Sequence, residues 1–287
     1  MFTSKVFELT IITPVYNRLH LINRMANNFS KIDYKGWSIQ WIIIDDGSEP
    51  ELSLTFDMPE SINVEIIRQE NAGKHVAINT ALPIANGLFT IIVDSDDFIN
   101  QRQYENIQSS IKEYGDNYNG FIAYNENQDG LILGNLPRAD KPFKKNDIFK
   151  IKGDYSRVVK TSIMSSCKFD VFDGEKFNTE INFWCKVHAK INFKVIEKAF
   201  VTIEYQPDGL SSKYHDLLRV NPKGLLTTIN KIIFLGYDLR YYYKFICYHL
   251  SHLDNPYLFI NKLHGLSFII KTLVAITIFS LRMTRGK

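Results

Sequence analysis

The chain has little of what marks several common protein classes. Only three of its 287 residues are cysteines, and Cys167, Cys185 and Cys247 form no Cys-x-x-Cys pair. This argues against a disulfide framework or a structural zinc site and favours a reducing cytoplasm. A formal net charge of +3 is too small to indicate nucleic-acid binding. No Gly-x-Gly-x-x-Gly occurs, and Gly73-Lys74 lacks the upstream glycine of a P-loop, which argues against a dinucleotide-binding dehydrogenase and a P-loop enzyme.

Long hydrophobic runs are also missing. The N-terminus shows no signal-peptide pattern, because charged residues interrupt its first apolar stretch. Residues 266–281 are apolar except for Lys271 and a few hydroxyls, and Arg282, Arg285 and Lys287 follow. A membrane-spanning helix needs about 20 apolar residues. Two readings of this segment stay open: a helix that lies at a membrane surface with a basic end, or a buried core helix.

What the chain does have is an alternation of strand and helix patterns. A hydrophobic fraction of 45%, with 20 Phe and 15 Tyr, is enough to build a substantial core. Apolar runs predict strands, and apolar residues at helical spacing predict helices between them. The predicted strands are 7–13, 39–44, 62–67 and 89–93, and the predicted helices are 19–29 and 72–85. This order predicts an α/β fold with a mostly parallel, doubly wound sheet.

Polar clusters follow three of these strands, at residues 13–17, 45–48 and 94–97. In open parallel sheets, ligands bind beyond the carboxyl ends of the strands. We therefore expect the three clusters to meet in one functional site.

The cluster Asp94-Ser95-Asp96-Asp97 carries the clearest chemistry. Three carboxylates within four residues repel one another unless a cation or hydrogen-bond donors compensate. Carboxylate oxygens suit Mg²⁺ or Mn²⁺, which complete their coordination with water and substrate phosphates. The pattern predicts a metal site and a phosphate-bearing substrate, and the alternative is an acidic surface turn.

Two further segments each have two readings. In Asp45-Asp46-Gly47-Ser48, a carboxylate could accept hydrogen bonds from a base or ribose, or the segment could be a turn with a helix cap. In residues 71–75, the helix start at Gly73 with Lys74 beside it could bind anionic oxygens, or it could be a simple cap with a solvated lysine.

Together these segments resemble glycosyltransferase family 2, which has the GT-A fold. The matching motifs are TPVYNR at 13–18, IIIDDGS at 42–48, ENAGKHVAINTAL at 70–82 and IVDSDD at 92–97. GEKFNTEINFW at 174–184 and EYQPDGLSS at 204–212 resemble a bacterial subgroup that makes surface polysaccharides. The resemblance implies a catalytic domain over residues 1–215, with a nucleotide-sugar half to about 115 and an acceptor half from about 116, before a helical region at 216–287.

The resemblance also implies roles by position. Asp46 matches the carboxylate that reads the base, Asp94 a donor-binding aspartate, and Asp96 the metal ligand with Asp97 beside it. The remaining residues expected to bind the nucleotide sugar are Thr13, Pro14, Tyr16, Asn17, Asp45, Asn71, Gly73, Lys74, Ser95 and Asp208. Asp208 stands where many relatives carry the histidine of Tyr-Arg-x-His.

Glu180 matches the general base. Many relatives carry Glu-Asp at this position, whereas Ile181 follows here, so Glu180 would have to act alone.

The implied function is metal-dependent, inverting sugar transfer with Mn²⁺ or Mg²⁺. The expected donor is a nucleotide-diphosphate sugar, with uridine as the expected nucleotide. The expected acceptor is a saccharide or lipid-linked oligosaccharide of capsule, O-antigen or exopolysaccharide synthesis, at the cytoplasmic face of the membrane. Two alternatives stay open: a degenerate transferase that binds without turnover, and a glycoside hydrolase that pairs Asp94 or Asp96 with Glu180.

Overall fold

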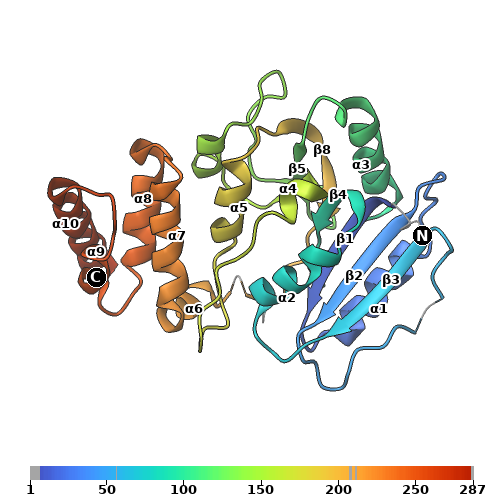
Figure 1. Ribbon diagram of the computed structural model, residues 1–287, viewed down its shortest axis with the longest axis horizontal. Coiled ribbons are helices and arrows are strands. Elements are labelled where there is room, and N and C mark those ends of the chain that lie inside the picture. The colour runs from blue at the N-terminus through green and yellow to red at the C-terminus, as the bar shows by residue number, and fades with distance from the viewer. Residues whose placement is uncertain (1–6, 56, 207–208, 211, 286–287) are drawn as a thin grey trace. The chain divides into compact units, whose positions relative to one another are not determined.

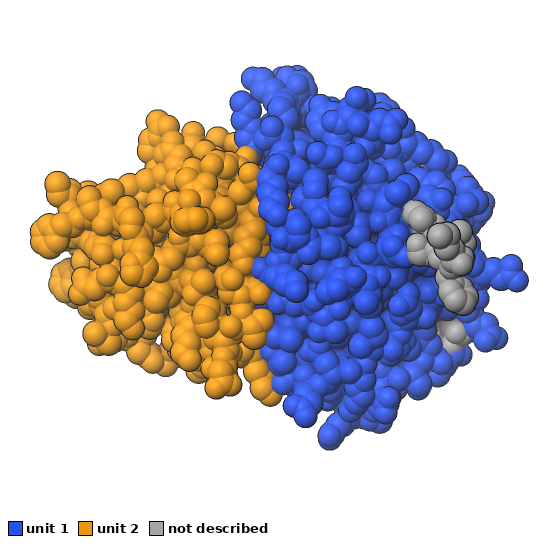
Figure 2. All heavy atoms as spheres, viewed as in Figure 1, with its two compact units in different colours: residues 1–144, 151–168, 190–206 blue, residues 145–150, 169–189, 207–287 orange. Residues whose placement is uncertain are grey.

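The structure is a computed structural model that describes residues 7–55, 57–206, 209–210 and 212–285. The chain forms two compact units, coloured separately in Figure 2. Unit 1 comprises residues 1–144, 151–168 and 190–206, and unit 2 comprises 145–150, 169–189 and 207–287. The two units therefore interleave along the chain. The division of domains at residue 215 stays a prediction.

Unit 1 is built on a sheet with the strand order β3-β2-β1-β4-β7-β5-β6, in which β8 also pairs with β5 (Figure 1). The pairs β1–β2, β2–β3 and β1–β4 are parallel, so the carboxyl ends of these four strands share one edge. The pairs of β7 with β4 and β5 are antiparallel. The strands are β1 (Phe7–Val15), β2 (Ile39–Asp45), β3 (Ile62–Arg68), β4 (Gly87–Ile92), β5 (Gly120–Glu126), β6 (Ile132–Leu133), β7 (Tyr155–Lys160) and β8 (Lys194–Thr202).

Helices cover both faces of this sheet, as a doubly wound fold requires. One face packs Trp41 of β2 against α1 (Leu19–Phe29) and α3 (Gln101–Tyr114). The other face packs against α2 (Lys74–Ala81), which continues as the 3₁₀ turn η1 (Leu82–Ile84), and against the short α4 (Thr161–Met164). The predicted α/β fold with a mostly parallel sheet in its first half is confirmed.

The structure differs from the predicted elements in three places. β1 runs to Val15 rather than stopping before Pro14, because pairing with β4 has already ended at Ile12 while pairing with β2 continues. The helix α3 and the strand β7 were not predicted. β7 separates β4 from β5 and reverses the strand direction there.

Unit 2 is helical apart from connecting segments. Figure 1 shows α7 and α8 side by side, and α10 packs against α8 and α9. Its elements are η2 (Lys145–Phe149), α5 (Glu180–His188), α6 (Tyr214–Val220), α7 (Pro222–Phe234), α8 (Leu239–Leu250), α9 (Pro256–Ile260) and α10 (Phe268–Arg285). The Tyr237 hydroxyl donates to the Cys185 carbonyl at 2.6 Å, which ties α5 to the segment after α7.

Candidate active site

The loop after β1 is fixed to the loop after β2. Asn17 adopts a left-handed conformation with φ of 53°, which asparagine tolerates better than most residues. Its backbone N–H donates to Ser48 Oγ at 2.9 Å, and its side-chain oxygen accepts from the Glu49 N–H at 2.8 Å. Tyr16 precedes it and is about half exposed (49%). The turn therefore presents an aromatic side chain at the carboxyl edge of the sheet.

The Asp45 carboxylate is buried and organises the loop that follows β2. It accepts from the N–H groups of Ser48 at 2.8 Å and Leu52 at 3.3 Å, and from Arg68 Nη1 at 2.6 Å. Burial alone would raise the pKa of Asp45, but these donors and the arginine charge outweigh it and lower that pKa below its usual value. Asp45 is therefore held as a carboxylate by the protein itself.

Asp46 is buried in the same way by the segment that precedes α2. Its carboxylate accepts from the N–H groups of Ala72 at 2.9 Å and Gly73 at 2.8 Å, and from Gln69 Nε2 at 2.7 Å. Asn71 Nδ2 lies 3.4 Å away. Gly47 makes this approach possible, because it adopts φ of 81° and a Cβ on it would lie 2.9 Å from the Asn71 nitrogen. The acceptor capacity of Asp46 is thus largely used within the protein.

A pocket of about 650 Å³ opens beside these two loops. Its volume falls within the range of small-molecule sites. Aromatic, amide and charged side chains converge on it, as expected for a site that stacks and hydrogen-bonds a polar ring. The lining residues are Tyr16, Asn17, Gly47, Glu49, Arg68, Gln69, Glu70 and Asn71.

The acidic cluster follows β4 at the same edge. One oxygen each from Asp94, Asp96 and Asp97 lies within 4.8 Å of the others. Asp97 is only 9% exposed, and its backbone N–H donates to the Asp94 carbonyl at 3.0 Å, so the turn is tight. Burial, followed by the charges of Asp94 and Asp96, raises the pKa of Asp97 well above its usual value. The fold holds three acidic groups close together, and their mutual repulsion raises the free energy of the folded protein. A bound cation would offset this repulsion.

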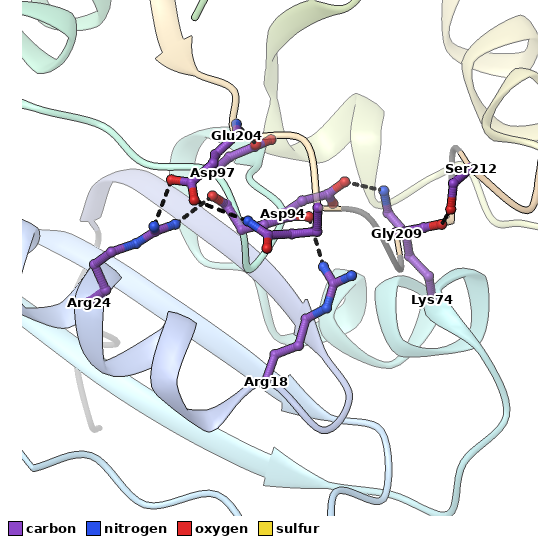
Figure 3. Close-up of polar contacts among 10 residues, drawn as sticks. Arg18, Arg24, Lys74, Asp94, Asp97, Glu204, Gly209 and Ser212 are labelled. Carbon is purple, nitrogen blue, oxygen red and sulfur yellow. Dashed lines mark hydrogen bonds and ion pairs between the residues drawn. The ribbon is translucent and has the colours of Figure 1, made fainter. Parts of the chain in front are cut away.

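Basic side chains contact this cluster (Figure 3). Arg18 Nη1 lies 2.8 Å from Asp96 Oδ2, and Lys74 Nζ lies 2.6 Å from Asp94 Oδ2. Arg18 directly follows the pocket residue Asn17. Lys74 directly follows Gly73, whose backbone N–H donates to Asp46. The pocket and the cluster are therefore linked by adjacent residues in two separate loops.

The end of β8 closes the other side of the cluster. Phe98 and Thr202 form an isolated bridge, and the Glu204 N–H donates to Asp97 Oδ1 at 3.2 Å. Arg24 joins both sides, because its guanidinium donates to the Asp96 carbonyl at 2.9 Å and to Glu204 Oε2 at 2.6 Å.

The donor set of the cluster fits a hard divalent cation. Carboxylate oxygens are the ligands that Mg²⁺ and Mn²⁺ prefer, and one or two carboxylates with substrate phosphates are a common arrangement. Asp96 and Asp94 are the more exposed members and face the basic side chains that a cation would replace.

The other predicted site residues are placed differently. Thr13 lies in the core, where its hydroxyl accepts from Trp41 Nε1 at 3.0 Å, and Pro14 is also buried in β1. Ser95 is buried within the acidic turn. Glu180 is exposed and begins α5 in unit 2. Asp208 lies outside the described residues.

Four charged residues of the site had no predicted role: Arg18, Arg24, Arg68 and Glu204. Arg18 stood inside a recognised motif, whereas Arg24 carried no signal, because a cation is ordinary on the polar side of the amphipathic helix α1. Arg68 ends a strand that is parallel to β2 and so reaches Asp45. Glu204 opened the recognised motif at 204–212, but its contact with Asp97, 107 residues away in the sequence, had no local signal.

The chain is similar to known proteins in sequence and in fold. Residues 10–173 match the model of glycosyl transferase family 2. The chain is 33% identical over 110 residues to glycosyltransferase GlyA of Streptococcus pneumoniae and 27% identical over 112 residues to the poly(ribitol-phosphate) β-N-acetylglucosaminyltransferase TarS of Staphylococcus aureus. These segments cover 37% and 38% of this chain but only 15% and 20% of the two bacterial relatives.

Solved structures support the fold. TarS residues 1–349 in complex with UDP-GlcNAc superimpose with a TM-score of 0.54 at 17% identity, over 88% of this chain and 79% of that one. The mannosyltransferase PcManGT of Pyrobaculum calidifontis, with GDP-Man and Mn²⁺, gives 0.53 at 16% identity, over 95% and 80%. Both likenesses extend through most of the chain and show the GT-A fold. Since the family match covers more than half of the sequence, the chain belongs to glycosyl transferase family 2.

Proposed function

We propose that the protein transfers a sugar from a UDP-sugar to an acceptor hydroxyl, with Mn²⁺ or Mg²⁺ and with inversion at the anomeric carbon. One observation carries the proposal: a pocket of nucleoside size and a cluster of three carboxylates lie at the same edge of one sheet. Nucleotide-sugar and Mn²⁺ complexes of proteins with this fold support the choice of ligands.

Within the pocket, we assign the base to the face of Tyr16 and to the polar groups around Gln69. Asp46 acts by holding the segment 71–73 in place, since two of its hydrogen bonds come from that backbone. Arg18 and Lys74 then carry the positive charge that meets the diphosphate, because both lie beside the carboxylates that hold the metal. A divalent cation bound at Asp94 and Asp96 would neutralise charge on the leaving diphosphate.

Glu180 is the proposed general base. It is exposed, and it lies in the first turn of α5. The carboxylate takes the proton of the acceptor hydroxyl as that oxygen attacks the anomeric carbon, and the bond to the diphosphate breaks in the same step. Glu180→Gln should lower kcat by roughly 10²–10⁴-fold and leave UDP binding unchanged.

We place the acceptor among saccharides or lipid-linked oligosaccharides used for capsule, O-antigen or exopolysaccharide, and the protein at the cytoplasmic face of the membrane. The name of one similar bacterial transferase gives a polymer, poly(ribitol-phosphate), as its acceptor, which supports a polymeric acceptor. The donor sugar and the linkage follow from a substrate screen.

The direct test is a panel of UDP-sugars with Mn²⁺, in which UDP release and the glycosylated product are measured together. We expect transfer that stops in EDTA and in Asp96→Ala, whereas Asp116→Ala, an exposed acidic change at the end of α3, leaves it intact. Transfer that persists at the wild-type rate in EDTA and in Asp96→Ala would contradict the metal assignment. Donor binding without any transfer would instead indicate a degenerate transferase.

A further inference from the structure

The C-terminal helix α10 exposes one continuous apolar face. Six large side chains on it are between 50% and 84% exposed: Phe268, Ile269, Leu273, Ile276, Phe279 and Met283. At 3.6 residues per turn these six lie on one side of the helix. Thr272 and Ser280 complete that side, and it carries no charged residue. Exposed apolar patches of this kind mark interaction surfaces.

The opposite side of the same helix is already used. Val274 and Ile278 are fully buried, and α10 packs there against α8 and α9. The helix therefore belongs to the packed body of unit 2 and still offers a second, uncovered face. One side of the helix lies in the core of unit 2, as one of the two readings of the sequence expected, and the membrane-surface reading stays a prediction. Among the described residues, no helix is long and apolar enough to cross a bilayer.

The charge around this face is strongly basic. From residue 238 to residue 287 the sequence has seven Lys and Arg and two acidic residues, Asp238 and Asp254, whereas the whole chain has a net charge of only +3. Asp238 is paired with Arg240. The excess of positive charge is thus concentrated in this region, and the rest of the chain is net acidic.

Two of these cations border the apolar face itself. Lys271 Nζ donates to the Asn261 carbonyl at 3.2 Å, and Arg282 lies 3.4 Å from the Asp254 carbonyl. Both contacts are to backbone oxygens, and the carboxylate of Asp254 is itself paired with Arg219 Nε at 3.0 Å.

We propose that this face of α10 docks on a membrane that contains anionic lipid, with the apolar side chains inserted at the level of the headgroups. Apolar area and basic charge act together in such binding. A second copy of the chain is the less suitable occupant, because it would bring an equally basic region against the first. The inference is independent of sugar transfer, since no residue of the candidate active site takes part.

The test uses the full chain and sedimentation with vesicles of phosphatidylcholine, with or without about a third phosphatidylglycerol. We expect binding to the anionic vesicles that is at least about tenfold tighter than to the neutral ones and that weakens as salt is raised. The variant Ile276→Gln with Phe279→Gln should weaken it about tenfold or more. Both sites are exposed, so melting should match the wild type. Leu131→Gln, at a site 64% exposed in unit 1, serves as the control and should bind as the wild type does.

Equal binding by the double variant and the wild type would overturn the proposal, as would no binding to anionic vesicles. A wild-type dimer that the double variant converts to monomer, seen by light scattering, would also overturn it and assign the face to a second copy. Because UDP binding is measured separately, vesicle binding without UDP binding would retain this inference and refute the UDP-sugar donor. UDP binding without vesicle binding would refute this inference and the proposed membrane location, and it would retain the donor assignment.

Discussion

Two acidic loops follow β2 and β4, two strands that run in the same direction in one sheet, and the protein treats them differently. After β2, Asp45 and Asp46 accept hydrogen bonds from four backbone N–H groups, those of Ser48, Leu52, Ala72 and Gly73. After β4, the carboxylates of Asp94 and Asp96 contact the ends of long basic side chains. Backbone donors are fixed by the fold, whereas a lysine or arginine can move away. The first loop therefore uses its charges for structure, whereas the partners of Asp94 and Asp96 in the second loop are side chains that a ligand could displace.

The pKa values of the two loops move in opposite directions for this reason. Hydrogen bonds and Arg68 overcome burial and lower the pKa of Asp45, while burial and neighbouring carboxylates raise the pKa of Asp97. Aspartates at equivalent strand ends thus differ: the fold favours the ionised form of Asp45 and disfavours the ionised form of Asp97. A pKa perturbed in this way is expected where a charged ligand binds.

The largest expected effect comes from removing a charge of the second loop. Asp96→Asn should lower metal-dependent transfer by roughly 10³-fold, because a metal supplies several kcal/mol of charge stabilisation at the transition state. Melting temperature should stay within about 1 °C of the wild type, since the side chain is held by Arg18 at a partly exposed position. Steady-state kinetics and calorimetric melting measure both. A large fall in melting temperature would show that this loop is structural too.

Removing a charge of the first loop should lower stability and leave metal binding unchanged. Asp45→Asn weakens the ion pair of the buried Asp45 with the partly exposed Arg68 and its backbone hydrogen bonds, so unfolding should become easier by about 1–3 kcal/mol. Metal binding by the folded protein should be unchanged. Urea unfolding followed by circular dichroism gives the first quantity, and Mn²⁺ titration gives the second. Loss of Mn²⁺ affinity at full stability would invert the roles given to the two loops.

Asp97→Asn should stabilise the metal-free protein. Its raised pKa means that the ionised form is penalised in the folded state, so the penalty is absent below the ordinary pKa and grows as pH rises through the folded value. At neutral pH we expect a melting temperature about 2–4 °C higher, which corresponds to about 1 kcal/mol for a protein of this size. The gain should shrink at acidic pH and when Mn²⁺ is added. Asp116→Asn, at an exposed site, is the control, and a pH-independent gain would argue against this cause.

The smallest effect concerns the cation that faces Asp96. Arg18→Gln removes a competitor for the metal, so affinity for Mn²⁺ alone should rise by about two- to fivefold, as expected for a pair worth up to about 1 kcal/mol. Arg24→Gln is a matched control, because Arg24 donates to the backbone carbonyl of Asp96 rather than to its carboxylate. The signal of free Mn²⁺ in electron paramagnetic resonance reports the affinity. Equal gains in both variants would indicate a general charge effect.

The sequence was sufficient for the parts of the fold that depend on local patterns. Residues 39–44 and 89–93 are nearly continuous in apolar character, as strands buried on both faces must be, and both strands formed. The meeting of the polar clusters at one edge followed from parallel strand direction alone. The strand β7 was missed because its placement between β4 and β5 is decided by antiparallel pairing over long range.

The different environments of the two acidic loops could not be predicted, because the sequence of each loop shows only aspartates that follow an apolar strand. The difference comes from which backbone donors reach each carboxylate. Gly47 and Gly73 bring the donors to Asp46 through positive φ angles, whereas Arg18 and Glu204 reach the second loop from 78 and 107 residues away. The roles of Glu180 and Asp208 rest on resemblance and stay predictions.

The central claim is that the second acidic loop binds a metal together with a nucleotide. The most direct measurement is calorimetric titration of UDP into the wild type and Asp96→Ala, first with Mn²⁺ and then with EDTA. We predict binding only in the wild type with Mn²⁺, while both proteins show the same melting temperature. Equal UDP binding by the two proteins, or binding that persists in EDTA, would contradict the account.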